Sequence, residues 1–283
     1  MSKVCIVFDR LRSEEKMLQK EAANLGHDAV MLDAKITQMN TDSKKEDYDF
    51  GDVVLERCVS YFRGLHFTAS LEFMDIPVLN KFEVANTCGN KMFMTLLLKK
   101  NNIPTPKTYF SFSSESAAEN LEKVGFPLVI KPVIGSWGRG VMPIEDKDTM
   151  EAIFEIRDIT DSPHDRIYYL QELIKRPPRD IRAIMVGDKI VAAIYRKSEH
   201  WKTNMALGGT AEPCKVTQEM EEMCIKAKNA VQGDIVGVDL MESEEKGLVV
   251  HEVNNTTEYK NTVRVCDVDI PALMLDYAMK VER

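Results

Sequence analysis

Residues 235–254 read IVGVDLMESEEKGLVVHEVN, two apolar strands that flank a charged turn at 245–247. If the strands pair, their two-residue period places Glu252 and Asn254 on one face, and Asp239 can face them across the ladder. Acids on a hairpin often face solvent, but each of these polar residues has apolar neighbours. Two carboxylates and an amide oxygen are hard ligands of the kind that magnesium prefers. We therefore expect a metal site at Asp239, Glu252 and Asn254.

Around this hairpin, residues 167–283 are expected to form a C-terminal lobe with an antiparallel sheet. Its other expected strands are YYLQELI, DIRAIMV and KIVAAIYR, and the last two are joined by the tight turn Gly187-Asp188-Lys189. Helices are predicted for TQEMEEMCIKAKNAV and for the segment from Ile270.

Residues 1–90 show a different pattern, in which short apolar runs alternate with helical ones. The expected strands are VCIVFD, AVMLD, DVVLERCVS and PVLN, with a helix over SEEKMLQKEAANLG. That alternation is typical of βαβ units with a parallel sheet. A further helix is predicted from Glu83 to Asn102, where Ile103-Pro104-Thr105-Pro106 ends it.

Between these regions, residues 91–166 predict a small α+β lobe. A strand at KTYFSF, a helix from Ser113 or Ser114 and the strand PLVIKPV precede a glycine-rich loop and a strand at VMPIED. The loop lacks the Gly-Lys-Ser/Thr of a P-loop and leads into a strand, so we interpret it as a hairpin lid rather than a dinucleotide-binding turn. Glycines let backbone amides approach phosphate, although a plain turn is an open alternative. The loop residues are Gly135, Ser136, Trp137, Gly138, Arg139 and Gly140.

Other polar residues are candidates for a nucleotide and a carboxylate. Lys131 lies in an apolar strand, where it needs a counter-charge or an aqueous cleft, and Lys91 offers a second cation. The edge residues Gln171, Glu172, Leu173 and Ile174 suit an adenine, whereas Arg196 suits a carboxylate. For each, a structural role is the alternative: a solvated lysine, an ordinary edge strand, a packing loop.

Composition restricts the class of protein. The formal charge is −8, with 44% hydrophobic and 29% charged residues, which argues against a nucleic-acid surface and for a folded chain. A local basic cluster is formed by Lys175, Arg176, Arg179 and Arg182. It is a candidate for binding phosphate or an acidic partner, and a solvated face is the alternative. The six cysteines form no CxxC pair, and no apolar run is long enough to span a bilayer, so we expect reduced thiols in a cytoplasmic protein with no membrane segment.

In their order along the chain these features resemble the ATP-grasp ligases, and in particular the LysX/ArgX family of carrier-protein-dependent lysine and arginine biosynthesis. The strings PVIGSWGRG, KSEHWKTNMALGG and HEVNNTTEYKNT carry the resemblance, which extends over essentially the whole chain. It implies an ATP-grasp fold preceded by a parallel-sheet pre-ATP-grasp domain. It also implies a reaction in which ATP, with two magnesium ions, phosphorylates the terminal glutamate of a small acidic carrier protein, LysW, and an amino acid's α-amine attacks.

The resemblance assigns further residues to these roles. Arg179, Asp180 and Asn204 join the nucleotide site, and Lys131, Arg196 and Asn204 act in catalysis. The amino-acid site is Arg196 with two segments: Met205, Ala206, Leu207, Gly208 and Gly209, and then Glu258, Tyr259, Lys260, Asn261 and Thr262. An acidic carrier also requires a basic docking face, which we expect at the cluster of residues 175–182. A homo-oligomer is an open alternative to a monomer.

The Asn261-Thr262 pair resembles the α-aminoadipate users, because glutamate users are expected to carry Gly-Phe there. Phenylalanine would shorten the pocket, whereas Asn and Thr leave length and donors for a distal carboxylate. One methylene is worth only about 1 to 3 kcal/mol, so glutamate or both acids remain alternatives. A non-catalytic nucleotide-binding module and a ligase that adds glutamate to a ribosomal protein tail are the other hypotheses.

Overall fold

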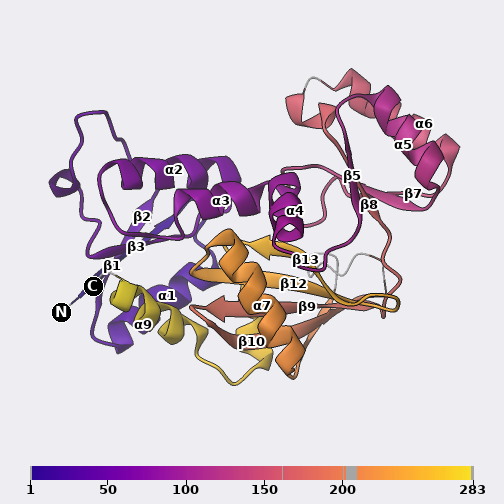
Figure 1. Cartoon of the computed structure of the whole chain (residues 1–283). Coiled ribbons are helices and arrows are strands. Elements are labelled where there is room, and N and C mark those ends of the chain that lie inside the picture. Colours follow the sequence, from indigo (N-terminus) through magenta and orange to yellow (C-terminus); the bar gives the residue numbers. More distant parts are fainter. Residues whose placement is uncertain (1, 161, 200, 202–208, 282–283) are drawn as a thin grey trace.

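The computed structural model describes residues 2–160, 162–199, 201 and 209–281. Three sheets succeed one another along this part of the chain: a four-stranded parallel sheet, a four-stranded central sheet and a five-stranded antiparallel sheet. In Figure 1 the central sheet lies at the upper right with helices α5 (Ser114–Val124) and α6 (Lys147–Ile159), apart from the body that the other two form. The predicted mixture of α/β and α+β structure is confirmed.

The N-terminal lobe contains the predicted parallel sheet in the order β2-β1-β3-β4. Its strands are β1 (Lys3–Phe8), β2 (Asp28–Asp33), β3 (Val53–Glu56) and β4 (Val78–Leu79), and its helical segments are α1 (Ser13–Asn24), η1 (Lys45–Asp47) and α2 (Tyr61–Phe73). Because β1 and β3 are parallel neighbours, the loops at 9–12 and 57–60 that follow them emerge at one edge of the sheet.

The single helix expected over 83–102 is instead two, α3 (Phe82–Gly89) and α4 (Lys91–Lys100). The side chain of Asn90 accepts hydrogen bonds from the backbone N–H groups of residues 92 and 93, and so caps α4. A Cβ on Gly89 would lie 1.8 Å from the ring of Tyr61, so only glycine fits at the break. The interruption places Lys91 at the first turn of α4, beside the central lobe.

The central sheet has the order β5-β8-β6-β7 and is antiparallel throughout. Its strands are β5 (Thr108–Ser111), β6 (Leu128–Lys131), β7 (Met142–Ile144) and β8 (Tyr168–Glu172), with the turn η2 (Pro163–Arg166) before β8. β6 and β7 form the predicted hairpin around the glycine-rich loop. The sequence predicts the strand at 168–172 in the C-terminal lobe, but that prediction is wrong. The strand pairs with β5 and β6, because its apolar face completes the core of the central lobe.

The C-terminal sheet has the order β11-β10-β9-β12-β13. The strands and helices of this lobe are β9 (Arg179–Val186), β10 (Lys189–Lys197), β11 (Thr210–Pro213), α7 (Gln218–Val231), β12 (Ile235–Ser243), β13 (Gly247–Asn254), α8 (Lys260–Val265) and α9 (Ile270–Val281). The predicted turns lie at Gly187 and Gly247, whose φ angles of +56° and +71° favour glycine.

The lobes differ in how their cores are shared. Apolar residues of β1, β3, α1 and α9 pack with β9, β10 and β12, so the N- and C-terminal lobes share one core. The opposite face of the C-terminal sheet packs against α4 and α7. The central lobe has a core of its own, drawn from α5, α6 and the strands of its sheet. The cavity described below lies where the three lobes meet.

Candidate active site

A cavity of about 1160 Å³ opens between the three lobes. Its lining combines loops after β1 and β3, the glycine-rich loop, the end of β8, and β12 and β13 with the segment that follows them. Most of the predicted site residues that the structure describes line it: Lys91, Lys131, Gly135, Ser136, Trp137, Gly138, Arg139, Gln171, Glu172, Leu173, Ile174, Arg196, Asp239, Glu252, Asn254, Glu258, Lys260, Asn261 and Thr262.

The wall formed by β12 and β13 carries the three expected metal ligands. Asp239 lies opposite Glu252 in the ladder, Gly237 lies opposite Asn254, and a bulge follows Asp239. Asp239 is buried and is held by two arginines: Arg182 bonds both of its oxygens at 2.5 and 2.7 Å, and Arg196 donates at 2.9 Å. Burial alone would raise the pKa of Asp239, but the two guanidinium groups outweigh burial and lower it. Asp239 is therefore an anion in this site.

Glu252 and Asn254 have fewer contacts than Asp239. The carboxylate of Glu252 lies 3.8 Å from the ammonium of Lys91, and the buried Nδ2 of Asn254 has no hydrogen-bond partner within the described residues. Among those residues no group of three or more His, Cys, Asp or Glu side chains is arranged to hold a metal alone. Two carboxylates and an amide oxygen therefore fit a magnesium ion that also takes phosphate oxygens, which is its usual manner of binding.

Lys131 extends from β6 into the same cavity and is 6% exposed. Its ammonium donates to the side-chain oxygen of Gln171, whose NH₂ in turn donates to Thr108 and Tyr169 at 3.0 and 2.8 Å. Burial, reinforced by the nearby cations, lowers the pKa of Lys131 to about 7. The Gln171 side chain is thus committed to holding Lys131, which leaves backbone groups and Leu173 and Ile174 for an adenine.

Lys91 joins α4 to the glycine-rich loop. Its ammonium donates to the carbonyl of Gly135 at 2.7 Å, and its backbone N–H donates to the carbonyl of Val133 at 2.8 Å. In the loop, Trp137 and Gly138 adopt φ angles of +58° and +68°. Arg139 lies over the indole of Trp137, 4.9 Å from the ring centre. The loop is therefore fixed at one end by Lys91, and its backbone turns toward the cavity.

Five predicted residues in the described part of the chain do not line the cavity: Gly140, Arg179, Asp180, Gly209 and Tyr259. Arg179 pairs with Glu242 at 2.6 Å, and Asp180 accepts two bonds from Arg196. Tyr259 is buried, and its hydroxyl donates to the carbonyl of Glu14 at 2.7 Å. Asp180 and Tyr259 therefore hold residues that line the cavity, Arg196 and Glu14. Asn204, Met205, Ala206, Leu207 and Gly208 lie outside the described residues.

The expected basic cluster does not form an open basic face. Lys175 pairs with Glu244, Arg179 pairs with Glu242, and Arg182 pairs with Asp239. Arg176 turns inward, where it lines the cavity and donates to backbone carbonyls, including that of Trp201 at 3.0 Å. The sequence did not predict these ion pairs, because the acids lie on strand β12 and in the turn after it, far from the basic residues along the chain.

Sequence reasoning missed the N-terminal lobe's share of the lining, which includes Arg10, Leu11, Arg12, Ser13, Glu14, Cys58 and Val59. A signal was present, because these residues follow β1 and β3 at the carboxyl edge of a parallel sheet, where ligands commonly bind. His251, the unpaired residue of the bulge on β13, also lines the cavity. Burial lowers its pKa, so the imidazole is neutral there.

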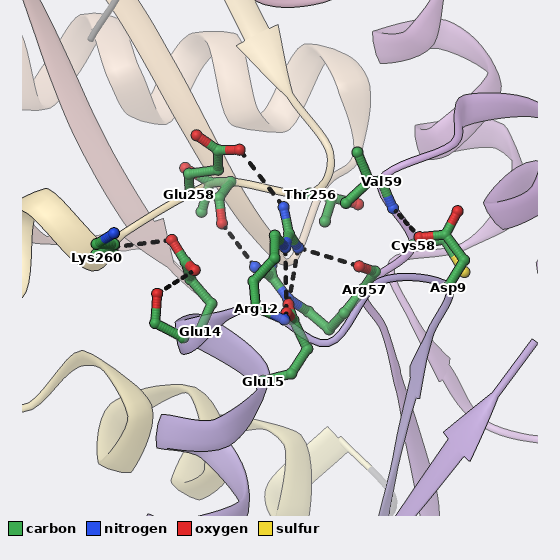
Figure 2. Close-up of polar contacts among 12 residues, drawn as sticks. Asp9, Arg12, Glu14, Glu15, Arg57, Cys58, Val59, Thr256, Glu258 and Lys260 are labelled. Atoms are coloured by element: carbon green, nitrogen blue, oxygen red, sulfur yellow. Dashed lines mark hydrogen bonds and ion pairs between the residues drawn. The ribbon is translucent and has the colours of Figure 1, made fainter. Parts of the chain in front are cut away.

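Figure 2 shows how these loops hold the segment after β13. Arg57 donates to the carbonyl of Thr257 at 2.9 Å and pairs with the buried carboxylate of Glu15 at 3.3 Å. Arg12 pairs with the same carboxylate, and its Nη1 lies 3.5 Å from Oε1 of Glu258. Segment 257–260 is therefore anchored to the N-terminal lobe by buried charges.

Comparison with known proteins agrees with this geometry. Residues 88–278 match the RimK-like ATP-grasp domain, and residues 4–87 match the LysX preATP-grasp domain. The chain is 38% identical to the α-aminoadipate–LysW ligase LysX of Saccharolobus solfataricus, over 94% of this chain and 97% of that one. It is 31% identical to the glutamate–LysW ligase ArgX of Sulfurisphaera tokodaii, over 97% of each.

Solved structures agree on the fold. A RimK-domain ATP-grasp protein from Sphaerobacter thermophilus superposes with a TM-score of 0.79 at 22% identity, covering 98% of this chain and all of that one. No helix of the described residues is long and apolar enough to cross a membrane. The predicted resemblance to the LysX/ArgX ligases is confirmed, and the chain belongs to the RimK-like ATP-grasp family, with a LysX-type preATP-grasp domain at residues 4–87.

Proposed function

We propose that this protein is an ATP- and magnesium-dependent ligase of lysine biosynthesis. It joins the α-amino group of α-aminoadipate to the γ-carboxylate of the C-terminal glutamate of the carrier protein LysW. The observation that carries this proposal is the 38% identity to a LysX over nearly the whole chain, in a protein whose cavity brings Lys91 and Lys131 to a wall of hard oxygen donors.

The reaction has two steps. In the first, a carboxylate oxygen of LysW takes the γ-phosphoryl group of ATP; a new O–P bond forms, the bond to the β-phosphate oxygen breaks, and ADP leaves. In the second, the amine attacks the acyl carbon; a C–N bond forms, phosphate leaves with the C–O bond electrons, and the amine loses a proton.

The chain's own groups serve these steps by position and charge. Lys91, Lys131 and the amides of the glycine-rich loop hold the phosphates, which supplies electrostatic stabilisation as charge moves to ADP. Asp239, Glu252 and Asn254 would hold the magnesium, which when bound neutralises the charge of the β- and γ-phosphates. Arg182 and Arg196 keep Asp239 ionised and oriented for this task.

Residues 261 and 262 support an amino acid with a distal carboxylate, and as an Asn-Thr pair they resemble the α-aminoadipate users. Both line the cavity, and Thr262 is 1% exposed with a hydroxyl that has no hydrogen-bond partner among the described residues. A buried hydroxyl without a partner costs free energy, which a ligand's carboxylate would recover. The second candidate is glutamate, alone or beside α-aminoadipate, since an ArgX is 31% identical and the two acids differ by one methylene.

ADP release with purified LysW tests the proposal. The expected result is that α-aminoadipate stimulates release and yields a LysW heavier by one α-aminoadipate residue in intact-protein mass spectrometry. Stimulation by glutamate alone would transfer the assignment to the second candidate. If neither acid stimulates release in the presence of LysW, the proposed function is wrong.

A further inference from the structure

Glu258 lies where all three lobes meet. The indole N–H of Trp137, in the glycine-rich loop of the central lobe, donates to Oε1 of Glu258 at 3.2 Å. Nη1 of Arg12, in the N-terminal lobe, lies 3.5 Å from the same oxygen. Glu258 itself follows β13 of the C-terminal lobe, and Figure 2 shows its carboxylate directed toward Arg12. One carboxylate thus contacts two lobes other than its own.

Arg12 is a rigid partner. Its guanidinium makes two hydrogen bonds to Glu15, at 3.1 and 2.7 Å, and donates to the carbonyl of Arg57 at 3.1 Å. Glu15 is 0% exposed and also pairs with Arg57. A guanidinium held in this way keeps its position when its fourth contact changes, so Arg12 supplies a fixed point for Glu258.

The backbone on either side of Glu258 is equally constrained. Arg57 holds the carbonyl of Thr257, while Glu14 accepts from the hydroxyl of Tyr259 through its carbonyl and from the N–H of Lys260 through its carboxylate at 3.2 Å. Asn261 and Thr262 follow directly. Trp137, by contrast, lies in a loop that connects two strands of a lobe with a separate core.

We infer that Glu258 is a positioning residue that latches the glycine-rich loop to the segment that receives the amino acid. Its Oε1 contacts both Trp137 and Arg12, so it acts on the reaction through the position of the loop. With the contact made, the loop that covers the nucleotide is held against residues 257–262. The role assigned to residues 261 and 262 rests on the proposed function, whereas the latch between Trp137 and Glu258 does not.

A double-mutant cycle tests the latch. Trp137→Phe removes the indole donor but keeps a ring for Arg139, Glu258→Ala removes the acceptor, and the third variant carries both changes. We measure the ADP dissociation constant by titration calorimetry, and kcat and KM for the amino acid. Each single change is expected to weaken ADP binding and raise the amino-acid KM about tenfold, the scale of one charge-assisted hydrogen bond. The double variant is expected to lose no more than either single one.

Two further variants give the cycle its controls. Glu258→Gln keeps an oxygen for the indole but loses the charge attraction to Arg12, so its effect is expected to be intermediate. Glu122→Gln breaks a surface ion pair with Lys147 in the central lobe, outside the cavity lining, and is expected to leave both constants unchanged. Thermal unfolding of Glu258→Ala is expected to match the parent, because this side chain is 43% exposed.

The outcomes separate the two proposals. Additive effects of Trp137→Phe and Glu258→Ala on ADP affinity, or no effect of either, would overturn the latch. Coupling in ADP affinity, in a protein that turns over neither α-aminoadipate nor glutamate, would support the latch while rejecting the proposed function. Turnover without coupling would support the proposed function while rejecting the latch.

Discussion

At the scale of single residues, Asp239 and Glu252 look alike in sequence but differ in their surroundings. Asp239 neutralises two arginines in a buried site, whereas Glu252 lies 3.8 Å from one lysine. Removing one member of a buried ion pair leaves an uncompensated charge, at a cost of about 3 to 5 kcal/mol. Both residues are expected to be required for turnover, but only Asp239 for stability.

The matched variants Asp239→Ala and Glu252→Ala check this difference. We expect both to lose ADP formation by at least about a hundredfold, the scale of lost electrostatic stabilisation at a reacting group. In urea denaturation, Asp239→Ala is expected to lose about 3 kcal/mol of unfolding free energy and Glu252→Ala less than about 1 kcal/mol. Equal stability losses would show that the arginines do not depend on Asp239.

Lys131 gives nucleotide binding a pH dependence. Its pKa is about 7 in the free protein, because burial disfavours the charged form, and an adjacent triphosphate would raise it. Above pH 7 the free ammonium loses its proton while the bound one keeps it. ATP affinity is therefore expected to fall as pH rises from 7 to 9, with proton uptake on binding.

Calorimetry at pH 8 in two buffers of different ionisation enthalpy measures that uptake. We expect different apparent heats for the parent protein, and a smaller difference for Lys131→Met, which cannot take up the proton. Equal heats for the parent would contradict a lowered pKa of Lys131 in the free state.

At the scale of elements, Asn80 fixes the two strands that carry the proposed metal ligands. Its amide oxygen accepts from the N–H groups of Asp234 and Ile235 at 2.9 and 3.0 Å, and its NH₂ donates to the carbonyls of Ile235 and Asn255 at 2.7 and 3.1 Å. These partners stand at the start of β12 and just after the end of β13. One buried side chain of the N-terminal lobe therefore holds both ends of the hairpin.

Asn80→Ala is expected to lower the unfolding free energy by about 3 kcal/mol, because several buried backbone groups lose their partners. It should also raise the magnesium concentration needed for half-maximal turnover, since β12 and β13 lose a shared anchor. Asn24→Ala, which removes an exposed bond to Glu21, is the control and should change neither quantity. A stable Asn80→Ala protein with unchanged magnesium dependence would contradict this role.

Local pattern was enough to predict the elements whose partners are close in sequence. The hairpin that carries Asp239 and Glu252, the hairpin around the glycine-rich loop and the parallel N-terminal sheet all follow from apolar periodicity and turn residues. The pairing of β8 with β5 and β6 did not follow, because the strands nearest to β8 in sequence belong to another lobe. The break at Asn90 was hidden by a periodicity that continues through it.

The candidate site was likewise predictable where its signal is local in sequence, and not where it depends on distant partners. Residues that resemble a family motif were found, and those in the described part of the chain mostly line the cavity. Arg10 and Arg12 were missed, and Arg12 acquires its importance from Glu258, which is distant in sequence. Arg182 was predicted as a member of the basic cluster, but its pairing with Asp239 was not. Charge pairing between residues so far apart along the chain is not readable from one sequence without the fold.

At the scale of the whole molecule, the central lobe has a core of its own, whereas the other two lobes share one. Such an arrangement permits sub-global opening of the smaller unit. We expect native-state hydrogen exchange to show lower opening free energies for amides of β6 and β8 than for those of β1 and β9, and bound nucleotide to raise protection in β6. A common opening free energy for all four strands would show that the lobes unfold as one body.

The short path from the proposed metal ligands to the proposed amino-acid segment has a consequence for redesign. Asn254 ends β13, Glu258 contacts the glycine-rich loop four positions later, and Thr262 lies within the first turn of α8. Both ends of this stretch are held by contacts with other elements. Inserting or deleting a residue there would therefore shift the proposed metal ligand or the loop contact together with the amino-acid segment. A designer who wishes to change the amino acid accepted by this scaffold should therefore keep the chain length constant and exchange side chains alone.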